Sequence, residues 1–277
     1  MVLQTEIYVK IRLSISFLFI VMITNLFGQK VFQPKQINSN FKGVVYKDEF
    51  SFDLRIMPHG FNLGYTVGEL QTYYKTTFYS FDIGVLRDSK ERKQNMNTNF
   101  NSEGSSDAFV YGKQNSLFVL RAGKGFKKYL SEKALRRGLA VGYSFEGGAS
   151  LGVLKPYYLK LIYDIEESEN GEIREIREER FSEGNREEFL NFNTIFGGGS
   201  FWKGFFQSSI AVGIHGKASG LFALGAYDKF VRAAEIGIAF DAFAKKMPIF
   251  VETDNLKNRR LFLNVFVSFH LGKRSLR

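Results

Sequence analysis

The sequence predicts an all-β protein: a single transmembrane antiparallel up-and-down β-barrel. Apolar side chains occupy alternate positions in residues 210–224, 234–242 and 261–271, with polar side chains between them. A period of two sends successive side chains to opposite faces of a strand. Long strands of this kind, following one another closely, are typical of barrels that cross a membrane.

The N-terminus has the layout of a secretory signal peptide. Lys10 and Arg12 precede an uncharged run over residues 13–27, and Gly28 follows it. The run is shorter than the roughly 20 residues that a spanning helix needs. We therefore expect a cleaved signal over residues 1–28, with an anchoring or buried helix as the alternative. The chain has no cysteine, which excludes a lipid-anchored N-terminus, disulfides and thiolate metal sites.

Residues 29–47 are expected to be a periplasmic lead-in, and residues 48–277 a single barrel domain. No other uncharged run approaches the length of a membrane helix, so the chain would cross a membrane with strands. Thirty Phe and thirteen Tyr fit the aromatic girdles of such a barrel, although a soluble β-sandwich can also be rich in aromatic residues.

Alternation defines the first half of the barrel. Phe50, Phe52 and Leu54 oppose Ser51, Asp53 and Arg55, and a Pro58-His59-Gly60 turn ends this strand. The next connections are a polar loop rich in Asn, Ser and Gly and a basic connector that could form a turn of helix. The expected strands are 48–57, 61–70, 73–86 and 115–125, with the loop at 87–114 and the connector at 127–137.

A fifth strand is expected to begin at Gly138 and to continue past Pro156 to Tyr163. An acidic segment follows, because residues 164–188 hold eleven Asp or Glu and four Arg while the whole chain has a net charge of +10. Within it, residues 172–181 fit either a short helix or a hairpin tip. The segment could bind divalent cations weakly, but a solvated charged loop is the simpler interpretation.

Eight strands place both ends of the barrel in the periplasm, with most of the long connections outside. Ten strands are the alternative if residues 189–196 also pair. The expected outer connections are 58–59, 87–114, 164–207 and 245–258, and the inner ones are 71–72, 126–137 and 227–228.

Alternation also directs a set of polar residues into the barrel. An eight-stranded barrel is just wide enough for its side chains to fill it. The set then forms either a salt-bridged plug, which we favour, or a polar lumen that guides a ligand. Its expected members are Asp53, Arg55, Asp82, Arg121, Glu146, His215, Lys217, Glu235, Asp241 and His270.

The sequence offers little for catalysis. Ser219 lies four residues from His215 on one strand, which is about 13 Å and too far for a hydrogen bond. No cluster of metal ligands appears outside the acidic segment, and Gly197–Gly199 lacks the strand-to-helix context of a phosphate loop. We expect no enzymatic activity, no cofactor and no bound metal.

Two C-terminal stretches carry a resemblance. The sequences AAEIGIAFDAFAKKMPIF (233–250) and LFLNVFVSFHLGKR (261–274), with FGQK at 27–30, resemble the small porin-like outer-membrane β-barrel proteins of Bacteroidota-type bacteria. The resemblance implies an outer-membrane location, and some relatives serve the secretion of surface proteins. One departure is that such barrels usually end on an aromatic residue, whereas here eight residues follow Phe269.

The expected role is a structural or interaction component of the cell envelope, accessory to secretion or surface assembly. A narrow channel or small-molecule transporter is the first alternative, and a lipid-active enzyme is the second. Lys and Arg are scattered through turns and strand ends, which favours anionic lipid over nucleic acid. The expected partners are outer-membrane lipid and lipopolysaccharide, with other envelope proteins as candidates and no nucleic acid.

Overall fold

The computed structural model describes residues 46–95, 107–130, 139–168, 171–224, 229–253 and 256–276, without the side chains of 164–168 and 171–174. The chain divides into two compact units, Met1–Gly43 and Val44–Arg277, and the described residues all belong to the second. The expected signal peptide, most of the lead-in, residues 131–137 of the basic connector and the turn at 227–228 lie outside the described residues.

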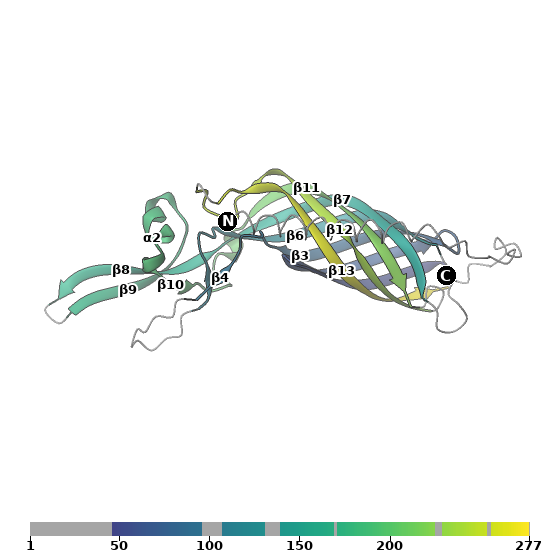
Figure 1. Cartoon of the computed structure of the whole chain (residues 1–277), viewed down its shortest axis with the longest axis horizontal. Helices are drawn as coiled ribbons and strands as arrows, with labels where there is room; N and C mark the ends of the chain where they lie inside the picture. Colours follow the sequence, from purple (N-terminus) through teal and green to yellow (C-terminus); the bar gives the residue numbers. More distant parts are fainter. Residues whose placement is uncertain are drawn as a thin grey trace, which may run out of the picture. The chain divides into compact units, whose positions relative to one another are not determined.

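Eight antiparallel strands close into one barrel, so the eight-strand prediction is confirmed and the ten-strand alternative is wrong. Each strand pairs with its two neighbours in the ring, and the first barrel strand pairs with the last to close it. Figure 1 shows the barrel from the side. The strands are β1 (Asp48–Met57), β2 (Gly60–Leu70), β3 (Lys75–Leu86), β6 (Asn115–Tyr129), β7 (Ala140–Pro156), β11 (Ser209–Ala223), β12 (Phe230–Met247) and β13 (Arg259–Ser275).

The up-and-down order gives the barrel two distinct ends. We call the loop end the one that carries the β1–β2, β3–β6, β7–β11 and β12–β13 connections. The terminal end carries the three other connections, the start of β1 and the end of β13. This grouping of connections matches the one expected from the sequence.

Several strands are longer than predicted. β6 continues to Tyr129, so the prediction that a basic connector begins at Lys127 is wrong. β12 and β13 also extend beyond the predicted 234–242 and 261–271 at both ends. Charged residues do not end these strands, because alternate ones point into the barrel and find partners there.

The fifth barrel strand does not continue to Tyr163 as predicted. β7 ends at Pro156, where β6 also runs out, since Asn115 at the start of β6 pairs with Pro156. Proline has no N–H to donate to a ladder, and the next residue, Tyr157, donates its N–H to Gln114 O at 2.9 Å. The chain therefore leaves the barrel at this point.

Residues after Pro156 form a second, smaller sheet in the order β10-β8-β9 (Figure 1). Its strands are β8 (Tyr158–Ser168), β9 (Gly171–Arg180) and β10 (Ile195–Gly198). Residues 172–181 thus belong to a hairpin and not to a helix, and the predicted 164–207 loop holds ordered structure. Phe189 of α2 (Arg186–Leu190) packs into its core with Phe109, Leu159, Leu161, Ile195 and Val251.

Short elements complete the described fold. They are β4 (Lys93–Gln94), β5 (Phe109–Val110) and the 3₁₀ helices η3 (Glu183–Asn185), η4 (Phe192–Thr194) and η5 (Phe205–Gln207). No helix among the described residues is both long and apolar enough to cross a membrane.

Candidate functional site

Arg55 of β1 lies buried in the barrel interior between two carboxylates. Its Nη1 donates to Asp82 Oδ2 at 3.0 Å, and its Nη2 lies 3.6 Å from Asp53 Oδ2. The guanidinium also lies 5.2 Å from the centre of the Phe266 ring. Gly64 stands between the carboxylates, where a Cβ atom would collide with Oδ1 of both Asp53 and Asp82. The missing side chain at Gly64 makes room for this triad.

Arg121 of β6 forms the second group. Its Nε and Nη2 donate to the two carboxylate oxygens of Asp241 at 2.6 and 2.9 Å, and its Nη1 donates to Asn62 Oδ1 at 3.1 Å. Paired hydrogen bonds of this kind are the strongest that an arginine makes with a carboxylate. β6, β12 and β2 are not neighbours in the barrel, so Arg121 links strands across the interior.

Lys217 of β11 holds two glutamates together. Its Nζ lies 2.7 Å from Glu146 Oε2 and 3.9 Å from Glu235 Oε2. All three side chains are buried. One ammonium between two carboxylates offsets part of the cost of placing these charges away from water.

The histidines join the same group. His215 Nε2 lies 3.4 Å from Glu146 Oε1, and His270 Nε2 lies 3.5 Å from Glu235 Oε1. Ser219 donates its hydroxyl to Glu235 Oε2 at 3.1 Å and not to an imidazole. A serine nucleophile is activated by a neighbouring base that takes its proton, and here the acceptor is the Glu235 carboxylate, which already faces the ammonium group of Lys217. The arrangement is that of a buried polar network.

A further group was missed by sequence analysis. Glu49 forms ion pairs with Lys127 and with Arg274, whose Nε lies 2.7 Å from Glu49 Oε2. All three side chains are buried, and Arg274 is among the largest fully buried ones. The alternation of side chains could have revealed this group. Each member shares a strand face with a residue that was expected inside the barrel: Glu49 with Asp53, Lys127 with Arg121, and Arg274 with His270. The predicted strands simply ended too early to include Lys127 and Arg274.

An apolar cluster closes the interior at the loop end. Ile249 and Phe250 lie over the strands there, and Gln114 and Asn115 both donate their N–H groups to Ile249 O. Asn115 Nδ2 also donates to Pro248 O at 2.7 Å. The other members are Leu86, Val110, Leu117, Val119, Leu154, Ala211, Phe243, Met247 and Phe262, with Leu256 packed against them.

The barrel interior contains a small hollow among the polar side chains. It lies among Lys127, Lys217, Glu235 and His270 and has a volume of about 10 Å³. A single buried water needs roughly 10–15 Å³. The space is therefore that of one water molecule, and these side chains fill the lumen around it.

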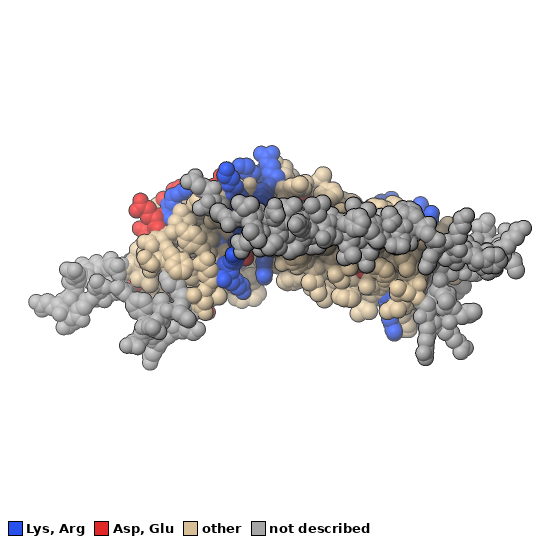
Figure 2. Space-filling view, in the orientation of Figure 1, with Lys and Arg blue, Asp and Glu red and all other residues tan. Residues whose placement is uncertain are grey.

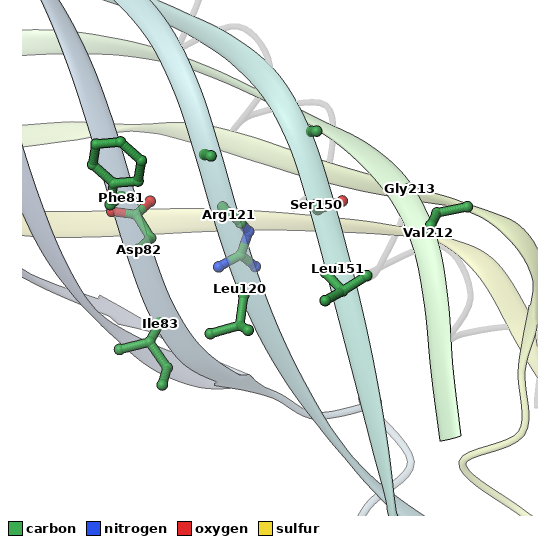
Figure 3. Close-up of a pocket in the computed structure, with 11 residues that line it drawn as sticks. Phe81, Asp82, Ile83, Leu120, Arg121, Ser150, Leu151, Val212 and Gly213 are labelled. Atoms are coloured by element: carbon green, nitrogen blue, oxygen red, sulfur yellow. The ribbon is translucent and has the colours of Figure 1, made fainter. Parts of the chain in front are cut away.

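Larger hollows lie on the outer wall. One of about 540 Å³ is lined by Phe81, Ile83, Leu120, Leu151 and Val212, which come from four neighbouring strands (Figure 3). Asp82 and Arg121 border it only from behind, because alternation turns their side chains into the barrel. A second hollow, of about 490 Å³, includes Phe126, Phe145 and Phe240. Both are gaps between large apolar side chains of the barrel surface.

All ten polar residues expected inside the barrel are buried, and the structure gathers them into the three groups around Arg55, Arg121 and Lys217. No group of three or more metal-ligating side chains is found in the ranges that the structure describes. Together these features define a closed eight-stranded barrel with an ion-paired interior and an apolar outer wall. No protein-family model matches this chain, and no curated protein matches it either.

Proposed function

We propose that the protein is an outer-membrane β-barrel that serves as a structural or interaction component of the cell envelope, accessory to secretion or surface assembly. The observation that carries this proposal is the reversed distribution of side chains. Charged groups fill the inside, while residues such as Phe52, Leu63, Val212 and Leu263 are more than half exposed on the outside. Water disfavours so large an apolar surface, whereas lipid chains match it.

Basic side chains support the same proposal. On the uncovered part of the face seen in Figure 2, Lys and Arg lie toward the two ends of the barrel, with few charged side chains between them. Exposed examples are Lys245, Lys246, Lys257, Arg259 and Arg260 at the loop end, and Lys47, Lys75, Lys128, Lys229 and Lys273 at the terminal end. These bands suit the anionic head groups of lipid and lipopolysaccharide, which are the proposed partners together with other envelope proteins.

The filled interior favours a component without a pore. A conducting barrel needs a continuous path of water, and the described lumen is occupied by ion pairs and by the apolar cluster at the loop end. The proposal accordingly includes neither conduction nor catalysis. A channel remains the alternative that the experiment tests directly.

The test is conductance of the purified protein in a planar bilayer, together with fractionation of native membranes. We expect the protein in the outer-membrane fraction and no steady conductance. Glu235→Ala should weaken the fold by about 1–3 kcal/mol, because it removes the carboxylate beside His270 and one of the two carboxylates beside Lys217, and it should not open a selective pore. Steady conductance whose ion selectivity changes in Glu235→Ala or Lys217→Ala would replace the proposal with the channel. Recovery from the cytosol would reject both.

A further inference from the structure

Residues 200–207 carry four exposed aromatic side chains outside the barrel strands. We call these residues the aromatic segment. Phe206 is fully exposed and Trp202 is 77% exposed, and Phe201 and Phe205 are each about half exposed. So many large apolar groups on one short connection are unfavourable in water.

One side of the aromatic segment rests on the barrel wall. The Phe201 ring packs edge-on against Phe118, an outward residue near the start of β6, with 6.2 Å between ring centroids. Lys155 Nζ, on the neighbouring strand β7, lies 4.9 Å from the centre of the Phe201 ring. The segment leads directly into β11, where Ile210 is 60% exposed. Its aromatic surface is therefore continuous with the outer wall at the loop end.

The other side is tied to the second sheet. Glu178 of β9 accepts hydrogen bonds from the N–H of Ser200 and from Lys203 Nζ. Gln207 Oε1 accepts from Tyr158 Oη and from Arg180 Nη1, both at 3.0 Å. Gly204 lies between these anchors with a φ of 75°, a left-handed conformation that glycine adopts without strain.

We propose that the aromatic segment is a lipid-binding site that inserts into the boundary between head groups and acyl chains at the loop end. The inference rests on the proposed function, because the lipid that it contacts is the bilayer around the barrel. Tryptophan, flanked by apolar rings and a lysine, is the composition that favours this boundary. Phe201 places the segment at the edge of the apolar wall, which is where the boundary of a surrounding bilayer would lie.

The contact would give the second sheet a fixed place at the membrane surface. A single residue between Pro156 and Tyr158 connects β7 to the second sheet, and the aromatic segment connects that sheet to β11. Lipid contact at residues 200–207 would hold this return connection, which Glu178 in turn ties to the second sheet.

The chain has a single tryptophan, Trp202, so its own fluorescence reports on the segment. The full mature protein is inserted into phosphatidylcholine vesicles that carry bromine, a quencher, either near the head groups or near the ends of the acyl chains. We expect quenching of Trp202, strongest with the shallow bromines. Phe201→Ser combined with Phe206→Ser should reduce that quenching by about twofold or more, since it removes the apolar contacts that hold the segment in place.

Two reporter variants separate this inference from the proposed function. In a Trp202→Phe background, Phe240→Trp places the reporter on the barrel wall, and deep bromines should quench it. In the same background, Phe192→Trp places it in η4 beside the second sheet, at an aromatic of similar exposure, and neither bromine should quench it.

Quenching at position 240 without quenching of Trp202 would reject the lipid site and leave the barrel proposal intact. Quenching of Trp202 by deep bromines alone would place the segment in the acyl core and reject the boundary. Absence of quenching at both positions would reject the membrane barrel, and the lipid site with it. Unchanged quenching in the Phe201→Ser, Phe206→Ser variant would show that these rings do not hold the segment in lipid.

Discussion

Paired charges stabilise the barrel interior at the level of single residues. Six buried carboxylates (Glu49, Asp53, Asp82, Glu146, Glu235 and Asp241) meet five buried cations (Arg55, Arg121, Lys127, Lys217 and Arg274), with two histidines beside them. The numbers of buried carboxylates and cations are nearly equal, and this matters because a buried charge without a partner is far more costly than a paired one. The interior thus depends on complete pairs more than on any single residue.

Arg121 and Asp241 provide a test of this dependence. Asp241→Ala should lower the free energy of unfolding by about 3–5 kcal/mol, because it leaves the Arg121 guanidinium buried without its carboxylate. The double variant Arg121→Met, Asp241→Ala should lose much less than the sum of the losses of Arg121→Met and Asp241→Ala measured singly. Urea unfolding followed by gel mobility measures all three. Additive losses would show that the two side chains do not act as a pair.

Gly64 tests the space that the Arg55 triad needs. Gly64→Ala should lower the free energy of unfolding by about 1–3 kcal/mol, because the new methyl group displaces the carboxylates of Asp53 and Asp82. Gly220→Ala is the matched control, since its Cβ would meet Phe222 Cε2 only at 3.8 Å. The same unfolding assay compares them. Equal effects of the two substitutions would contradict the triad's crowding.

Individual strands have two faces with opposite environments. On β12, Ile238 is 54% exposed on the outside and pairs with Val265, while Asp241 on the same strand lies in the interior at 3% exposure. The same strand therefore presents apolar side chains outward and charged ones inward, and a shift of register by one residue would exchange the two faces.

Depth along β12 should set the cost of an outward charge. Ile238→Arg should cost about 2–4 kcal/mol near the bilayer midplane, and Phe230→Arg at the end of the strand about 0–1 kcal/mol. Both residues point outward and are similarly exposed, at 54% and 56%, so they differ mainly in depth. Unfolding of each variant from lipid vesicles gives the comparison. Equal costs would mean that the wall does not face a bilayer.

The second sheet should respond to acid through Glu178. Burial alone would raise the pKa of this carboxyl, but the hydrogen bonds from Ser200 N–H and Lys203 lower the pKa below its usual value of 4.5. Because the attached state has the lower pKa, the attachment of the aromatic segment is fully present above about pH 4.5. It is lost as the pH falls through the lowered pKa.

Trp202 emission measures this transition. In the wild type it should stay constant from neutral pH down to about 4.5 and change below that. Glu178→Gln should show no acid transition in the same range, because its amide does not titrate. An identical transition in both proteins would assign the effect to other carboxylates.

At the scale of the whole molecule, closure removes the free edges of the sheet. β1 and β13, the first and last barrel strands, pair over nine residue pairs from Asp48 to Ile56. A closed barrel has no exposed ladder for detergent or another chain to attack. The first and last barrel strands are therefore held together by the same backbone pairing that closes the barrel.

Closure predicts a shift in gel mobility. The mature protein, unheated in dodecyl sulfate, should migrate at a position different from that of the boiled protein, because the closed barrel resists unfolding until it is heated. A chain that lacks β13 should migrate identically with and without heating. A full-length protein without any shift would argue against a closed barrel in detergent.

Much of this barrel followed from local sequence. Alternation in stretches such as 210–224 was enough to predict strands, their faces and the buried position of Glu235 and Lys217, because a strand's period of two depends only on its backbone geometry. The grouping of the connections at two ends also followed, since consecutive antiparallel strands must alternate in direction.

Tertiary structure decided which side chains pair across the barrel and where the strands end, and alternation along one strand cannot predict either. Which carboxylate meets which cation depends on register across strands, so the pairing of Arg121 with Asp241, 120 residues away, was not visible in either strand alone. Lys127 looked like the start of a connector because lysine is usually exposed to water. In the barrel its ammonium forms an ion pair with Glu49, a residue distant in sequence. Likewise, β8 has the alternation of a barrel strand, but β6 begins only at Asn115, opposite Pro156, and leaves β8 no partner in the barrel, so β8 pairs with β9 in a second sheet.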